Sequence, residues 1–273
     1  MNYASLLVHV ELEPSNDAVL RVAGGLAAFL GSRVIGAAAN DPEPPAYAEG
    51  IVAAGLVAQD RRAMAGKMNA AEQRFRAAMA ACSVPCEWRQ GFERPAEFVA
   101  RHGRAADLLI AGLGCYGVLD DPRYVLDPTE LVLKAGRPLL VVPPEVQALS
   151  AQRIVVGWKN TREARRAIWD ALPLLRTAAQ VVVAHVSEAD EGDNEAALDD
   201  VVAWLALHQV SASKRVARSF NGTGETLTEI VEDERADLLV VGAYGHSRVG
   251  EWIWGGVSQK LLTSSEICCL FSH

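Results

Sequence analysis

Small residues gather near the end of the chain in a spacing suited to phosphate binding. Gly242 and Gly245 are followed, after a nine-residue spacer, by Gly255 and Gly256, and an apolar helical run begins shortly afterwards. Glycine lets backbone amides approach a ligand closely, and a helix N-terminus adds unpaired N–H groups and a positive dipole. The spacing therefore predicts a phosphate-binding loop. The alternative interpretation is that these glycines only turn the chain and cap the last helix.

The place of this stretch in the chain favours ligand binding. It directly follows the apolar run 238–242, which is typical of a strand buried on both faces of a parallel sheet. Open parallel sheets bind ligands at the carboxyl ends of their strands, near the switch in strand order. We therefore expect the loop to lie at that edge of the sheet.

The chain repeats itself, which explains its length of 273 residues, about twice that of a usual domain. A nine-residue stretch around Asp107 is echoed around Asp237, 130 positions later, and each half opens on a short apolar run. The sequence therefore predicts two domains, residues 1–143 and 152–273, joined by a short polar segment after two prolines.

Within each half, strand-like runs alternate with helical stretches. The alternation predicts two tandem doubly wound α/β domains, each with a parallel sheet and helices on both faces. We expect five strands in each sheet in the order 3-2-1-4-5, one of the orders that doubly wound sheets adopt. In the second half, helices are expected over 161–176, 195–207, 225–234 and 257–264. The first half carries about 18 extra residues between its second and fourth strands, and Asp41–Pro45 marks a loop in this insertion.

The composition excludes several classes of protein. Acidic residues outnumber basic ones by 34 to 26, a net charge of −8, whereas nucleic acids and anionic membranes are bound by basic faces. No apolar run approaches the roughly 18 residues that cross a bilayer, and the first residues do not resemble a signal peptide. We expect a cytoplasmic protein that binds neither nucleic acid nor membranes. The five cysteines lack metal-site spacing, so reduced structural thiols and no metal are expected.

The order of elements, the Asp-Leu-Leu-Val-Val-Gly strand and the glycine spacing resemble the universal stress protein family, in a tandem two-domain form. Family members that bind adenine nucleotides use this pattern for phosphate and ribose. The resemblance therefore implies an adenine nucleotide, ATP in the first place, with or without Mg²⁺. The positions that carry over are Gly242, Tyr244, Gly245, Gly255, Gly256, Val257 and Ser258. The family usually has Ser or Thr where this chain has Gly256, so one hydroxyl is missing, and Ser258 matches a further contact.

The adenine side of the implied site departs from the family. The family places an acidic residue just after the first strand, whereas here Gly157 and Trp158 are followed by Lys159, which cannot accept a hydrogen bond. Lys159 can meet phosphate as a point charge or simply lie in solvent, and Trp158 can stack on a base or block the pocket. Val186 matches the valine that lines the adenine pocket in the family, and His246 is a further candidate for phosphate.

The first half departs further from the pattern. The positions equivalent to the second glycine pair hold no glycine, and Asp127 falls at or beside the place where phosphate would dock. A carboxylate within about 4 Å of a phosphate costs on the order of 1 kcal/mol or more. Asp127 precedes Pro128, which is typical of a helix N-cap, while Glu11 keeps the acidic position after the first strand. We predict that the first domain binds no nucleotide and serves as a packing partner.

The familiar catalytic motifs are absent from the sequence. It contains no Gly-x-Ser-x-Gly elbow, no phosphate loop ending in Gly-Lys-Ser/Thr and no His-x-x-x-His pair. We therefore assign no catalytic residue and predict a stress-linked regulator. A nucleotide-free protein-interaction module is the alternative, and slow ATP hydrolysis is left open with His246 as its one candidate base.

The last strands of the two halves are candidates for pairing. Family domains pair through their last strands, so residues 138–142 and 268–271 are expected to act as pairing edges. The two domains would then form an internal pseudo-dimer, and whether two chains also form a homodimer stays open.

Overall fold

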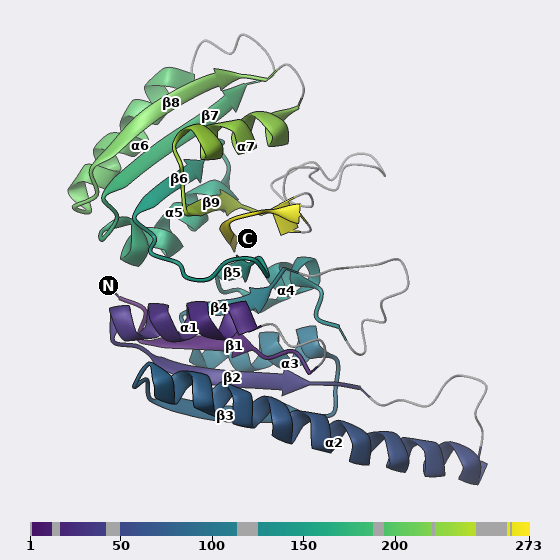
Figure 1. The fold of residues 1–273 in the computed structure, drawn as a ribbon. Coiled ribbons are helices and arrows are strands. Elements are labelled where there is room, and N and C mark those ends of the chain that lie inside the picture. Colours follow the sequence, from purple (N-terminus) through teal and green to yellow (C-terminus); the bar gives the residue numbers. More distant parts are fainter. Residues whose placement is uncertain are drawn as a thin grey trace.

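Ten strands form one continuous sheet in the order β3-β2-β1-β4-β5-β10-β9-β6-β7-β8 (Figure 1). The fold is taken from a computed structural model, which describes residues 2–12, 17–41, 50–113, 125–187, 194–219, 222–243, 261–262 and 264–273.

The first half supplies five strands and four α-helices. The strands are β1 (Ser5–His9), β2 (Arg33–Ala39), β3 (Cys86–Gly91), β4 (Leu108–Gly112) and β5 (Leu139–Val142). The helices are α1 (Asp17–Leu30), α2 (Gly50–Ala81), α3 (Pro95–His102) and α4 (Pro128–Ala135), with a short 3₁₀ turn, η1 (Gly103–Ala105), after α3.

The second half repeats this alternation. Its strands are β6 (Arg153–Gly157), β7 (Gln180–Ser187), β8 (Ala212–Arg218), β9 (Leu238–Gly242) and β10 (Cys268–Ser272). Its helices are α5 (Arg162–Leu175), α6 (Asn194–Leu207) and α7 (Thr223–Asp233). Of the helix expected over 257–264, Leu261, Leu262 and Ser264 are helical, and its other residues lie outside the described part of the chain.

Both halves have the strand order 3-2-1-4-5, and neighbouring strands within each half are parallel. Every residue of β1, β4 and β5 is buried, as the continuous apolar runs predict for strands covered on both faces. The predicted fold class is therefore confirmed. The observed bounds of α5, α6 and α7 lie within two residues of those predicted.

The two halves meet at one antiparallel strand pair, β5 with β10. Val141 lies opposite Cys269, Leu140 opposite Leu270, and Leu139 opposite Phe271. These are the two edges expected to pair, and all six side chains are buried. The inner edges of the two half-sheets, β5 and β10, therefore pair with each other. The outer edges of the sheet are β3 and β8.

Two hydrophobic cores run the length of the sheet, one on each face. One core joins α1 and α2 of the first half with α5 and α6 of the second, and the other joins α3, α4 and α7. Equivalent helices thus cover the same face, so an approximate two-fold axis normal to the sheet relates the halves at the antiparallel pair. The buried Tyr3 hydroxyl adds a polar tie between the halves, because it donates to the carbonyl oxygen of Asp170 in α5.

Most of the extra length of the first half is helical. Helix α2 has 32 residues, whereas its counterpart α6 has 14. Met68, Phe75 and Met79 anchor the second part of α2 in the core, and its first part extends beyond the sheet (Figure 1). The loop expected at Asp41–Pro45 lies, apart from Asp41, outside the described residues.

None of the described helices is long and apolar enough to cross a membrane.

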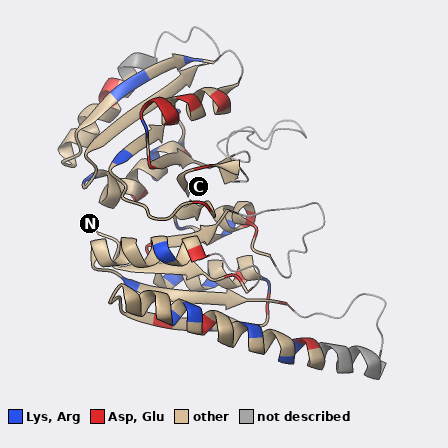
Figure 2. Ribbon diagram, in the orientation of Figure 1, with Lys and Arg blue, Asp and Glu red and all other residues tan. Residues whose placement is uncertain are grey.

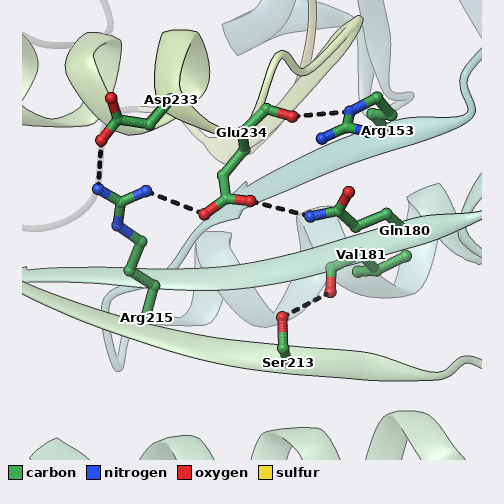
Figure 3. Close-up of polar contacts among 7 residues, drawn as sticks. All are labelled: Arg153, Gln180, Val181, Ser213, Arg215, Asp233 and Glu234. Carbon is green, nitrogen blue, oxygen red and sulfur yellow. Dashed lines mark hydrogen bonds and ion pairs between the residues drawn. The ribbon is translucent and has the colours of Figure 1, made fainter.

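A polar network fixes the amino edge of the second half (Figure 3). Arg215 of β8 binds Asp233 at 2.5 Å and Glu234 at 2.9 Å, at the C-terminus of α7. Glu234 also accepts from the Gln180 side chain, and its carbonyl oxygen accepts from Arg153 at 2.7 Å. The network ties α7 to the starts of β6 and β7, at the end of the sheet away from the candidate site.

Candidate functional site

The carboxyl ends of β6, β7 and β9 lie side by side and form the edge where the site is expected. Gly157, the last residue of β6, pairs with Ala184 of β7 on one side and with Val241 of β9 on the other. The chain leaves β6 between strands that come later in the sequence, so this is a switch point of the topology.

Of the predicted site residues, five fall in the described part of the chain. These are Gly157, Trp158, Lys159, Val186 and Gly242. The other predicted residues, Tyr244, Gly245, His246, Gly255, Gly256, Val257 and Ser258, lie outside the described residues.

Gly242 allows a close approach between β9 and α5. A Cβ atom at this position would lie 2.6 Å from the backbone nitrogen of Ala164 and 2.6 Å from the backbone carbonyl carbon of Glu163. Side-chain carbons do not approach backbone so closely, so only glycine fits without a shift of α5. The glycine places the N-terminus of α5, with its positive dipole, directly against the start of the glycine-rich stretch.

Gly157 also has a packing role. A Cβ atom here would lie 2.9 Å from Cγ1 of Val241 and 3.1 Å from Cδ2 of Leu227. Both neighbours are side chains of the core under α7, and side chains shift more easily than backbone. The requirement for glycine is therefore weaker here than at position 242.

Trp158 and Val186, the two residues assigned to the adenine side, face opposite sides of the sheet. Trp158 is 8% exposed and belongs to the core under α5 and α6. Val186 packs against the core under α7. The structure therefore does not bring these two side chains onto one face.

Lys159 lies exposed in the turn between β6 and α5. Its carbonyl oxygen accepts from the Thr161 N–H at 2.6 Å, and the Thr161 hydroxyl caps α5 by accepting from the Ala164 N–H at 3.3 Å. The exposed ammonium group and the N-terminus of α5 thus place positive charge at the same edge.

Glu163 is a buried carboxylate at this edge that the sequence did not single out. Its side chain is 1% exposed and one oxygen pairs with Arg162. Burial opposes ionisation, yet hydrogen bonds from Arg162, its own backbone N–H and Thr161 outweigh burial and hold the pKa of Glu163 below its usual value. Glu163 lies two residues after the Thr161 cap, where acidic residues are common and usually exposed. The sequence alone therefore gives no sign that its side chain is buried.

Three buried polar atoms near the edge have no hydrogen-bond partner among the described residues. They are Oε2 of Glu163, Nε2 of His185 and Oγ of Ser272. Ser272 lies beside Gly242 in the sheet register, and His185 donates through Nδ1 to the Trp158 carbonyl oxygen at 3.0 Å. Buried polar groups are normally paired, so among the described residues these three atoms have hydrogen-bonding capacity that no neighbour uses.

The family model for the universal stress protein family matches residues 150–272. The second half of the chain is a universal stress protein domain. No curated protein matches the sequence.

Solved structures extend the likeness in fold to the whole chain. A universal stress protein from Archaeoglobus fulgidus superposes with a TM-score of 0.74 at 14% identity, covering 98% of this chain and 95% of that one. A putative universal stress protein from Pseudomonas aeruginosa gives a TM-score of 0.57 at 15% identity, covering 99% and 93% of the two chains. At these identities the likeness concerns the fold.

The first half differs from the universal stress protein domain at the same edge. His9 ends β1 where Gly157 ends β6, and its ring is buried at 4% exposure. Burial lowers the pKa of His9 to about 4. Burial also raises the pKa of the nearby Glu11 to about 7. Asp127 caps α4 as expected, because its carboxylate accepts from the Thr129 N–H at 2.8 Å.

Metal-binding groups do not gather in the part of the chain that the structure describes. No three His, Cys, Asp or Glu side chains there come together in a metal-like cluster. The four described cysteines are free, and Cys268 and Cys269 are buried in β10.

Proposed function

We propose that this chain is a stress-response regulator that binds an adenine nucleotide, ATP in the first place, in its second domain, residues 152–273. The observation that carries the proposal is the contact between Gly242 and the first turn of α5. This contact joins the start of the glycine-rich stretch to a helix N-terminus and to Lys159, which suits a polyphosphate.

The residues present fit such a ligand on two further grounds. The unpaired atoms of Glu163 and Ser272 offer hydrogen-bonding capacity next to Gly242. A buried acceptor at Glu163 also offers a substitute for the acidic residue that Lys159 replaces, because a ribose hydroxyl needs an acceptor.

In this proposal, the predicted site residues other than Trp158 have roles in binding or in shaping the site. Gly245, Gly255, Gly256 and Ser258 hold phosphate and ribose, with Tyr244, His246 and Val257 beside them, and Val186 lines the adenine pocket. Lys159 neutralises phosphate charge, and Mg²⁺ is compatible with the site. Trp158 belongs to the protein core and does not stack on the base, because it faces α5 and α6.

The first domain, residues 1–143, acts as the packing partner in an internal pseudo-dimer. The pairing of β5 with β10 supports this role, since it uses the last strand of each half within one chain. A homodimer would then need a different surface. The buried His9 ring, in the place of Gly157, supports the proposal that this half binds no nucleotide.

We assign no catalytic residue and place the protein in the cytoplasm. The net charge of −8 agrees with a protein that binds neither nucleic acid nor membranes. The adenine nucleotide would act as a regulatory ligand that stabilises one state of the second domain.

The test compares wild-type protein with a Gly245→Asp, Gly256→Glu double variant. Both proteins are purified without added nucleotide and denatured, and the supernatants are analysed for adenine nucleotides by chromatography. We expect nucleotide from the wild type alone and a rise in its melting temperature on addition of ATP. Nucleotide from neither protein, with no thermal shift, would instead support a protein-interaction module.

A further inference from the structure

A second concave site lies between α5 and α6, on the face of the sheet opposite Val186. It is a groove of about 690 Å³, within the size range of small-molecule sites. Trp158 and Ile168 line its interior and are 8% and 2% exposed. The floor of the groove is therefore apolar and protected from solvent.

A pair of packed tryptophan rings forms one wall of the groove. Trp169 of α5 and Trp204 of α6 both line the groove, with ring centroids 6.2 Å apart, and Trp169 is 43% exposed. Val201 of α6 adds an aliphatic surface. A flat, apolar wall of this kind favours a planar aromatic ring.

Three arginines from the start of α5 line the same groove. Arg162 pairs with Glu163, and Arg166 pairs with Asp170 at 2.8 Å. Arg165 donates to the neutral side-chain oxygen of Asn160 at 2.7 Å and makes no ion pair with any described residue. Its guanidinium group therefore keeps its charge available for a carboxylate or phosphate.

Both faces of the second half carry acidic residues, and the α5–α6 face adds three arginines. Acidic side chains gather on α7 (red in Figure 2), where Glu225, Glu229, Glu232 and Asp233 lie. On the opposite face, the groove has three arginines and one lining acid, Asp200. Since Arg162 and Arg166 already pair with acids, the group that an anion in the groove would meet is Arg165.

We propose that the α5–α6 groove binds a planar aromatic compound that carries a carboxylate or a phosphate. The ring stacks against the Trp169–Trp204 pair, and the anionic group meets Arg165 at the mouth. The groove borders the proposed phosphate side at the first turn of α5, whereas Val186, assigned to the adenine pocket, lies on the opposite face of the sheet.

Calorimetric titration of the full chain, saturated with ATP, tests the proposal. The probes are 2-naphthoate, naphthyl phosphate and the neutral 2-naphthamide. We expect at least one anionic probe to bind ten-fold or more tightly than the amide, and the better anion identifies the headgroup. Arg165→Gln should weaken the anions at least five-fold and leave the amide unchanged, whereas Trp169→Ala should weaken all three.

Matched variants separate these effects from general changes. Arg21→Gln removes an exposed arginine from α1, and Leu207→Ala removes an apolar side chain that is 83% exposed, so neither should alter binding. Equal affinity for the amide and the anions, no binding of any probe, or full affinity in Arg165→Gln would overturn the proposal. Binding of an acidic peptide without binding of naphthoate would do the same.

Discussion

Asp237 holds the start of β6 in the same way that Asp107 holds the start of β1. The Asp107 carboxylate accepts from the N–H groups of Ala4 and Ser5 at 2.8 and 3.0 Å. The Asp237 carboxylate accepts from the N–H groups of Gln152 and Arg153, both at 3.0 Å. The most visible repeat in the sequence is therefore a structural clamp at the amino edge of each half-sheet.

Removing either clamp should destabilise the protein without affecting ligand binding. Hydrogen bonds to a charged acceptor are stronger than neutral ones, so we expect Asp237→Ala to lower the free energy of unfolding by about 2 kcal/mol. Asp237→Asn should cost less, because its amide oxygen still accepts. Urea unfolding measures both, with Asp107→Ala as the matched variant. A loss of ATP binding in a folded Asp237→Ala protein would contradict this assignment.

Gly242 and Gly157 should differ in their tolerance of a methyl group. Gly242→Ala places its Cβ 2.6 Å from backbone atoms of α5, whereas Gly157→Ala meets side chains at 2.9 Å and beyond. We expect Gly242→Ala to cost about 3 kcal/mol and Gly157→Ala about 1 kcal/mol. Thermal unfolding provides the comparison.

Gly66 is the control for this pair. It lies in helix α2, and a Cβ atom there would meet nothing within 4 Å, so Gly66→Ala should stabilise the protein by about 0.5 to 1 kcal/mol. Equal stability of the Gly242→Ala and Gly66→Ala proteins would show that the backbone of α5 does not pack closely against Gly242.

His9 and Glu11 give opposite contributions to the dependence of stability on pH. The pKa of Glu11 is raised from 4.5 to about 7 by burial, so between these values the unfolded state has lost a proton that the folded state keeps. Stability then falls as the pH rises through this window. The pKa of His9 is lowered from 6.5 to about 4 by burial, so the unfolded state binds the extra proton and stability rises with pH from 4 to 6.5.

Glu11→Gln should separate the two contributions. We expect this variant to match the wild type at pH 4.5 and to exceed its stability above pH 7 by on the order of 3 kcal/mol. His9→Gln should retain the fall in stability with rising pH. Denaturant unfolding from pH 4.5 to 8 measures both, with the exposed Glu145→Gln as control. Identical pH profiles for wild type and Glu11→Gln would refute the raised pKa.

The strands and most helix bounds could be predicted from the sequence, because both depend on local pattern. Buried parallel strands appear as continuous apolar runs, and the cap residue Asp127 is recognised by the proline that follows it. Pairing of β5 with β10 required the resemblance to a family, since no local signal specifies an antiparallel step between halves.

Which face of the sheet each site residue occupies could not be predicted in the same way. Trp158 shares the face of Val156 by simple alternation, but whether Val186 lies on that face depends on the register between β6 and β7. Glu163 was missed for a related reason, because its burial follows from the close approach of α5 to Gly242. Contacts between distant segments leave little trace in one sequence.

Cys268 and Cys269 should be unreactive in the folded protein despite being adjacent. Burial raises the pKa of each thiol to about 12, so almost no thiolate exists at pH 8. A variant with Ser in place of Cys82, Cys86 and Cys115 retains only these two thiols. We expect mass spectrometry to find no alkylation by iodoacetamide in the native variant at pH 8, and two labels per chain in guanidinium chloride. Rapid labelling of the native variant would mean that β10 opens from β5 and β9, and would count against the closed central pair on which the internal pseudo-dimer depends.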